Sequence, residues 1–146
     1  MEKKTLALID FFNLEAELNG VANTKTGEKL FQGLLSQKLS LKTKYWLTDL
    51  SKKVKTETDA CESLKNELIK KYGEEKDGGQ IGIETFIKGD DDKQVLNPAF
   101  IEFEKEYSAL LKEEREIEYK PLSINDLGNV ETSENYNIIY SLIMVD

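Results

Sequence analysis

The chain has 146 residues, of which 39% are hydrophobic and 33% are charged, and its formal net charge is −8. A chain of this length fits one domain, and the high charge content predicts a surface-rich, elongated fold. The excess of negative charge argues against direct binding to nucleic acid or to an anionic membrane surface, except by residues of the first half of the chain. The sequence has no histidine, so the commonest general base and the commonest transition-metal ligand are missing.

The negative charge lies mainly in the second half of the chain. Residues 1–75 contain 13 lysines and 12 acidic residues, whereas residues 76–146 contain 6 lysines and one arginine against 16 acidic residues. The sole cysteine, Cys61, excludes a disulfide framework. No apolar run approaches the ~20 residues of a membrane span, and Asp10 interrupts the N-terminal apolar stretch too early for a secretory signal. We therefore expect proteins, and not membranes, as partners. We also expect the protein to work in a reducing compartment or in a particle assembled there.

The N-terminal quarter predicts a short strand followed by a helix. Residues Lys4–Leu8 have the composition of a strand, and Ile9–Leu18 has the apolar spacing of a helix. The Asn19–Gly20 pair ends that helix. A polar loop follows, and Leu30–Leu39 predicts a short helical turn.

One long amphipathic helix is predicted from Ser40 to Gly73. Ser40 is a good N-cap residue, and Gly73 allows the chain to leave the helix through a left-handed conformation. At 1.5 Å per residue this helix is roughly 50 Å long. Its apolar side chains recur at a spacing of three and four residues, interrupted by Glu57 and Thr58, and they are Leu47, Leu50, Val54, Cys61, Leu64, Leu68 and Tyr72.

A second amphipathic helix is predicted over residues 98–114. Asn97 is a good N-cap, and Pro98 suits the first helical position. Before it, the Gly78–Gly79 turn and the polar tip 89–94 flank a predicted strand, Ile81–Lys88. Apolar residues at 3-4-3 spacing, Phe100, Phe103, Tyr107 and Leu110, are expected to pack antiparallel against the later half of the long helix.

The C-terminal region predicts an extended segment and a last helix. Pro121 keeps residues 116–124 extended, and this segment is expected to pair with Lys4–Leu8. Ser133 is expected to cap the last helix, whose apolar side chains are Tyr136, Ile138, Ile139, Leu142 and Ile143. The fold class is therefore mainly α with a small β component: a long antiparallel helical hairpin, short terminal helices and a minor sheet, in a single elongated domain over residues 1–146.

Three acidic groups resemble sites but have simpler explanations, which are solvated charge for two of them and a helix-terminal role for the third. The Asp90–Asp92 run lacks the spacing of a calcium loop. Glu113, Glu114, Glu116 and Glu118 have basic neighbours and the spacing of an exposed face. Asp10 suits a helix terminus. No phosphate loop, nucleophile elbow or paired-cysteine motif occurs, so we expect no catalytic residue, no metal site and no cofactor.

The early part of the long helix is the predicted interface. The second helix is about half as long as the first, so the region of Tyr45, Trp46 and Leu50 must be covered by the N-terminal helix, by the C-terminal helix or by another chain. Tyr and Trp are common interface anchors, although packing in the core is the favoured interpretation for this pair. Tyr136 and Ile139 of the C-terminal helix are the other interface candidates, and that helix is the expected cover for Trp46.

The order of these segments resembles a group of small uncharacterised proteins encoded by tailed bacteriophages. The resemblance covers about residues 5–143, and its most specific pieces are KKYGEEKDG at Lys70–Gly78 and IEYKPLSINDL at Ile117–Leu127. The GDDDKQVLN insertion before Pro98 departs from the compact turn expected there. The resemblance implies a viral protein located in the virion, or in the host cytoplasm during infection, but it transfers no catalytic residue.

Two functional hypotheses follow. The first is a non-enzymatic structural or assembly protein of the phage head, neck or tail, which contacts other phage structural proteins or further copies of itself, because the long helix leaves apolar surface for neighbours to bury. The alternative is a small acidic phage protein that binds and inhibits a host enzyme or defence factor, its C-terminal half resembling nucleic acid in charge.

Overall fold

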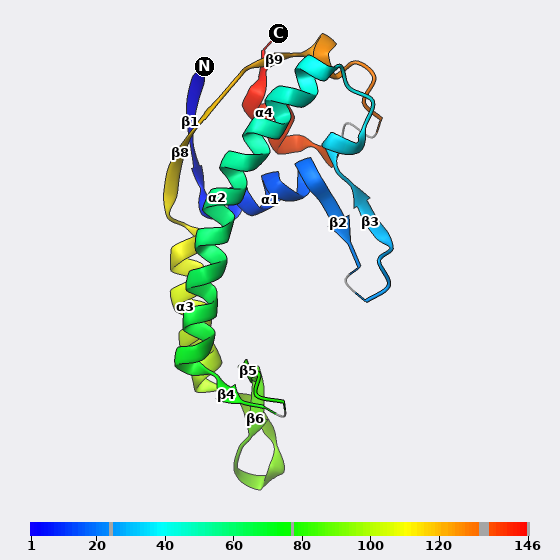
Figure 1. Cartoon of the computed structure of the whole chain (residues 1–146). Coiled ribbons are helices and arrows are strands. Elements are labelled where there is room, and N and C mark those ends of the chain that lie inside the picture. The colour runs from blue at the N-terminus through cyan, green and yellow to red at the C-terminus, as the bar shows by residue number, and fades with distance from the viewer. Residues whose placement is uncertain (24, 77, 132–134, 146) are drawn as a thin grey trace. The chain divides into compact units, whose positions relative to one another are not determined.

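The computed structural model describes residues 1–23, 25–76, 78–131 and 135–145. The chain is mainly helical with several two-stranded sheets, and this confirms the predicted fold class (Figure 1). It divides into two compact units, Met1–Thr58 with Glu114–Asp146 (unit 1) and Asp59–Glu113 (unit 2). Helix α2 (Leu41–Tyr72) contributes residues to both units. The single domain over residues 1–146 stays a prediction.

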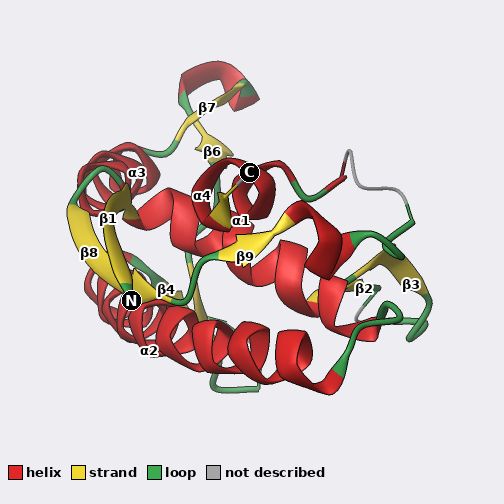
Figure 2. Cartoon of the chain, turned by 90° about the horizontal axis from the view of Figure 1, so that it is seen from above, coloured by secondary structure: helices red, strands yellow, loops and turns green. Residues whose placement is uncertain are grey.

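Unit 1 is built around a helix and a pair of antiparallel strands from opposite ends of the chain. Strand β1 pairs with β8, as the sequence predicts, and Figure 2 shows the two strands side by side. The register sets Lys4 opposite Ile117. Its elements are β1 (Glu2–Ala7), α1 (Leu8–Asn19), β2 (Gly20–Ala22), β3 (Lys29–Gln32), the 3₁₀ turn η1 (Leu34–Ser36), the first part of α2, β8 (Glu114–Tyr119), β9 (Leu122–Ser123), the 3₁₀ turn η3 (Ile124–Leu127), α4 (Asn137–Ile143) and β10 (Met144–Val145), which pairs in parallel with β9.

The core of unit 1 lies where α1, α2 and β8 meet. Helix α1 buries Phe11, Leu14 and Leu18, and β8 buries alternate residues, Ile117 and Tyr119, because successive side chains of a strand point to opposite faces. Helix α2 buries Leu47, Leu50 and Val54. Each fully buried side chain of this size stabilises the fold by about 1.5–3 kcal/mol.

The polar interruption of the apolar stripe of α2 has a structural explanation. Thr58 is buried and its hydroxyl donates to the Glu15 carboxylate of α1 and to the Lys55 carbonyl. Glu57 accepts a hydrogen bond from the Arg115 guanidinium of β8 at 3.2 Å. Both side chains therefore bind neighbouring elements of unit 1.

The predicted helical turn at residues 30–39 is mostly wrong. The structure instead pairs β3 with β2 in a hairpin, and only residues 34–36 form a 3₁₀ turn. The C-terminal helix also differs from its prediction, since α4 has its main contacts with α1 and not with the start of α2. The predicted cap, Ser133, lies outside the described residues.

Unit 2 is a helical hairpin with two small β-hairpins at the connection. Helix α3 packs against the later part of α2, where the Lys65 ammonium lies 5.4 Å from the centre of the Tyr107 ring and the Lys71 and Glu106 side chains form an ion pair at 3.6 Å. Cys61 is the sole buried side chain among the described residues of this unit. The remaining elements are β4 (Glu74–Glu75), β5 (Ile81–Gly82), β6 (Phe86–Lys88), the 3₁₀ turn η2 (Asp90–Asp92), β7 (Gln94–Leu96) and α3 (Pro98–Leu111).

Three details of unit 2 differ from the predictions. The strand expected over Ile81–Lys88 is divided, because β5 pairs with β4 and β6 pairs with β7. The second helix ends at Leu111 instead of residue 114, because Glu114 already belongs to β8. Gly73 ends α2 without a positive φ. It is needed for space, since a Cβ there would lie 2.4 Å from the Ile69 carbonyl oxygen and 2.8 Å from that of Gly82.

Ser40 caps α2 as predicted, and the cap supports a testable expectation. The Thr43 backbone N–H donates to Ser40 Oγ at 3.1 Å, and the Ser40 hydroxyl donates to Thr43 Oγ1 at 2.9 Å. We expect Ser40→Ala to lower the free energy of unfolding by about 1 kcal/mol, because it removes an N-terminal cap. Urea denaturation followed by circular dichroism measures this. Ser36→Ala, at an exposed serine nearby, is the matched control, and equal midpoints for the two variants would contradict the expectation.

Candidate interaction surface at the start of helix α2

The first turns of α2 present two large apolar side chains to solvent. Leu41 and Tyr45 are one helical turn apart and are 87% and 64% exposed. The opposite face of the same turns is buried through Thr43, Leu47 and Leu50. Leu41 and Tyr45 thus lie on the solvent face of α2, and their exposure does not result from a gap in the core.

Trp46 lies beside this surface and is half-buried. Its ring meets that of Tyr45 edge to face, with the ring centres 5.0 Å apart. The Lys120 ammonium, from the segment between β8 and β9, lies 5.9 Å from the centre of the Trp46 ring. A cation near an aromatic face stabilises both groups modestly. Lys120 and Tyr45 therefore cover Trp46 in place of the C-terminal helix that the sequence suggested.

The apolar pair is surrounded by lysines. Lys38, Lys42 and Lys44 are all exposed, and no acidic residue occurs between Lys29 and Thr48. The first acidic residue of α2, Asp49, is paired with Lys53 at 3.2 Å. We call the set Lys38, Leu41, Lys42, Lys44 and Tyr45 the α2-start surface. It is a positively charged apolar surface on a chain whose net charge is negative.

The other predicted interface residues lie in the core of unit 1. Leu50 is 3% exposed, and Tyr136 and Ile139 are fully buried. The Tyr136 hydroxyl donates to the Gln32 carbonyl oxygen at 2.8 Å and accepts from Gln37 Nε2 at 3.1 Å. These three residues contribute to packing within the chain. An interface role for Tyr45 and Trp46 stays a prediction.

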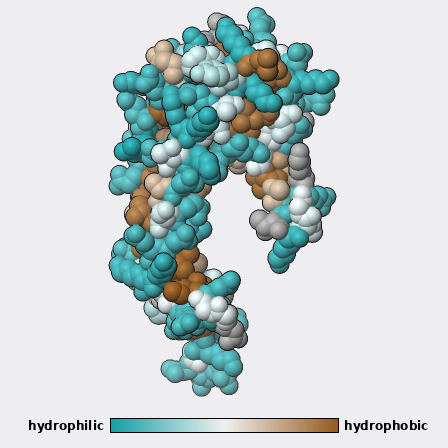
Figure 3. Space-filling model, in the orientation of Figure 1, coloured by the Kyte–Doolittle hydropathy of each residue, from teal (hydrophilic) through white to brown (hydrophobic). Residues whose placement is uncertain are grey.

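A second exposed apolar surface lies on the β6–β7 hairpin of unit 2. Its register sets Phe86 opposite Leu96 and Ile87 opposite Val95, so the two faces of this ribbon each carry one apolar pair. All four side chains are between 40% and 53% exposed. Figure 3 shows hydrophobic residues reaching the surface in several separate places on one side of the molecule. The hairpin therefore has apolar surface on both faces that unit 2 leaves uncovered.

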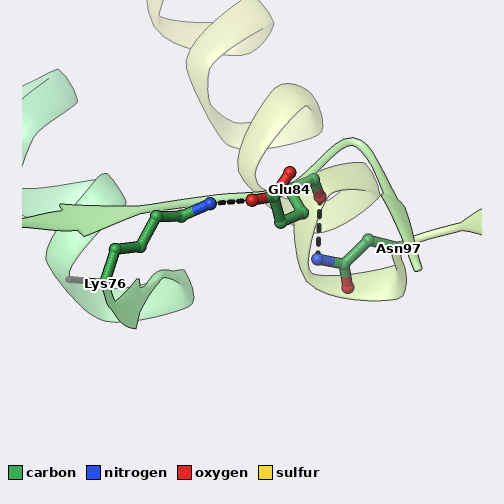
Figure 4. A network of polar contacts seen from close by, with 3 residues as sticks. All are labelled: Lys76, Glu84 and Asn97. Carbon is green, nitrogen blue, oxygen red and sulfur yellow. Dashed lines mark hydrogen bonds and ion pairs between the residues drawn. The ribbon is translucent and has the colours of Figure 1, made fainter. Parts of the chain in front are cut away.

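The base of this hairpin is fixed by polar contacts. Asn97 donates from its side-chain amide to the Glu84 carbonyl oxygen at 2.8 Å and from its backbone to the Thr85 carbonyl oxygen at 2.9 Å. The Glu84 carboxylate forms an ion pair with Lys76 (Figure 4). Asn97 also caps α3, since its side-chain oxygen accepts from the Ala99 N–H. One asparagine thus joins the start of α3 to the hairpin.

The two acidic clusters that the sequence singled out are exposed, as expected. Asp90, Asp91 and Asp92 form the exposed tip of the β6–β7 hairpin. Glu114, Glu116 and Glu118 alternate on the exposed face of β8 and do not continue a helix, and Glu113 is exposed as well. Glu116 is paired with Lys3 of β1 at 3.8 Å. Asp10 lies in the first turn of α1, where a negative charge is favourable.

The role of Glu17 was not predicted from the sequence. This α1 side chain is 7% exposed, and its carboxylate accepts hydrogen bonds from the backbone N–H groups of Ile138 at 2.9 Å and Ile139 at 3.2 Å. These are the second and third residues of α4, whose N–H groups have no partner within the helix. Burial raises the pKa of Glu17, and the two N–H donors oppose the increase. Its place among Phe11, Leu14 and Leu18 on the apolar stripe of α1 was the available signal.

The described residues hold no group of three or more acidic or cysteine side chains arranged to bind a metal ion. Within that same part of the chain, no helix combines the length and the hydropathy required to cross a membrane. Comparisons with protein-family models, with curated proteins and with solved structures find no match to this chain. The resemblance to small proteins of tailed bacteriophages therefore stays a prediction.

Proposed function

We propose that the chain is a non-enzymatic structural or assembly protein of a tailed bacteriophage, a component of the head, neck or tail that acts through protein–protein contacts. The observation that carries this proposal is the presence of exposed apolar side chains on both units: Leu41 and Tyr45 in unit 1, and the two cross-strand pairs of the β6–β7 hairpin in unit 2. Exposed large apolar side chains that lie next to each other are candidates for interaction sites.

The shape of the hairpin supports the same proposal. A two-stranded ribbon is marginally stable in water by itself, and this one has an apolar pair on each face. Contact with a neighbouring subunit would cover at least one face. The partners are accordingly other phage structural proteins or further copies of the chain, in the virion or in the host cytoplasm before assembly.

Mass spectrometry of purified virions tests the proposal. We expect peptides of this chain at a constant ratio to the major structural proteins across the fractions of a density gradient. An abundant non-structural phage protein serves as the control for contamination. If the chain stays with that control in the soluble fraction and is absent from particles, the proposal fails.

The charge of unit 2 favours a second candidate function. Residues 59–113 contain 14 acidic residues and 8 lysines, and a surface of this kind suits an inhibitor that binds a basic site on a host enzyme or defence factor. In a pulldown from infected cells, this function requires recovery of one host protein, with binding that weakens as salt is added. Recovery of phage structural proteins alone, insensitive to salt, would exclude it.

A further inference from the structure

The α2-start surface and the β6–β7 hairpin are complementary in chemistry. The first has two exposed apolar side chains, Leu41 and Tyr45, among three exposed lysines. The second has exposed apolar pairs behind a tip of three consecutive aspartates, Asp90–Asp92. Lys88 and Lys93 flank that tip, so its local charge is −1, while unit 2 as a whole carries six more acidic residues than lysines.

The hairpin has the form of a ligand that inserts into another surface. Its Phe86–Leu96 face and its Ile87–Val95 face are both apolar and both exposed. Phe86 and Leu96 form one exposed cross-strand pair, and Leu41 and Tyr45 form an exposed pair one helical turn apart. Placing the aspartate tip among Lys38, Lys42 and Lys44 would bring opposite charges together around this apolar contact, which favours one orientation and speeds association.

We propose that the α2-start surface of one copy binds the β6–β7 hairpin of a second copy, so that the chain associates with itself head to tail. The two surfaces differ from each other and lie on separate units of the same chain. A contact between them is therefore heterologous. A dimer formed by one such contact still has one free surface of each kind, one on each copy, which can bind further copies. Contacts of this class build rings and filaments. The inference takes its biological setting from the proposed assembly function, but it concerns the purified chain.

Two double variants test the contact from its two sides. Leu41→Glu with Tyr45→Glu places negative charge on the solvent face of α2, away from the core. Phe86→Thr with Leu96→Thr removes one apolar pair, and threonine has a high strand propensity, so the hairpin should be retained.

The control, Asn66→Glu with Ser108→Glu, adds the same charge as the α2 double variant, at exposed helical positions outside both surfaces. A triple variant, Asp90→Asn, Asp91→Asn and Asp92→Asn, keeps a residue type that tolerates the positive φ of Asp91 and Asp92.

Sedimentation velocity over a concentration series provides the measurement, and circular dichroism checks that each variant is folded. We expect the average mass of the unmodified chain to rise with concentration, and to rise less at high salt. The dissociation constant for self-association should be at least about tenfold higher in each double variant. The asparagine variant should weaken association in the same direction. A mixture of the two double variants should form dimers and nothing larger, because only one intact contact remains between them.

The control variant should associate like the unmodified chain. A chain that stays monomeric at every concentration would overturn the proposal, as would association that persists in both double variants. Loss of association without rescue on mixing would indicate a symmetric contact and would overturn it too. The proposal would also be overturned if the α2-start surface bound duplex DNA or anionic vesicles and the chain did not associate with itself. Each result is independent of whether the chain is found in virions, so the two proposals can fail separately.

Discussion

Replacing Gly33 by alanine is expected to lower the free energy of unfolding of unit 1 by about 3 kcal/mol, the upper end of the usual cost of overpacking. Gly33 is buried where the end of α1 meets the end of β3. A Cβ on Gly33 would lie 2.4 Å from both the Asn19 carbonyl carbon and the Gly20 nitrogen, and 2.5 Å from the Leu18 carbonyl oxygen. These are backbone atoms, so relief requires the hairpin to move away from the helix.

The backbone conformation of Gly33 isolates this steric effect. Its φ of −72° and ψ of 153° are available to any residue, so alanine adds no backbone strain of its own. Trp46 is the sole tryptophan and lies in unit 1, so its fluorescence during urea denaturation reports on the relevant unit. Gly128→Ala is the matched control, because the nearest atom, the Asn125 carbonyl oxygen, is 3.4 Å away. Equal midpoints for the two variants would show that the α1–β3 junction is not closely packed.

The sequence predicted those elements whose signals are local. The spacing of apolar residues located α1, α2 and α3 to within a few residues, and Ser40 and Asn97 act as the caps that their residue types indicated. The pairing of β1 with β8 was also predictable, because Pro121 ended the helical pattern and left an extended segment that needed a partner.

The predictions failed where the partner of a segment decided its conformation. Residues 29–32 form a strand because they pair with β2. The spacing of their apolar residues suited a helix equally well, so the sequence alone did not indicate the strand. Ile81–Lys88 divided because each end is closed into its own hairpin by a separate turn. At the start of α2 the sequence singled out the region of Tyr45, and an interface there stays a prediction. The exposure of Leu41 depends on which face of the helix turns toward α1 and β8, and the periodicity of the apolar residues did not determine that at the helix start.

Glu17→Ala is expected to lower the free energy of unfolding by about 2 kcal/mol, since the buried N–H groups of Ile138 and Ile139 lose their acceptor. The Glu17 carboxylate acts as the N-terminal cap of α4, although it comes from a helix more than a hundred residues earlier in the chain. Glu17→Gln keeps an oxygen acceptor at the same place and removes the charge, so we expect it to retain most of the stability. A glutamine variant as unstable as the alanine variant would show that the charge itself is required.

The pH dependence of these variants tests the same contact by a second route. Burial raises the pKa of Glu17 above its ordinary value of 4.5. The Glu17 carboxyl group therefore binds its proton more tightly in the folded chain than in the unfolded chain. The contribution of Glu17 to stability is therefore greatest at low pH and falls as pH rises from 4.5 through the raised value, above which it stays constant. Glu17→Gln lacks this titration. The stability of the glutamine variant relative to the unmodified chain should therefore increase across that interval, measured as urea midpoints by Trp46 fluorescence at a series of pH values. A difference that is constant with pH, or that decreases, would mean that the carboxylate is not buried against α4 in solution.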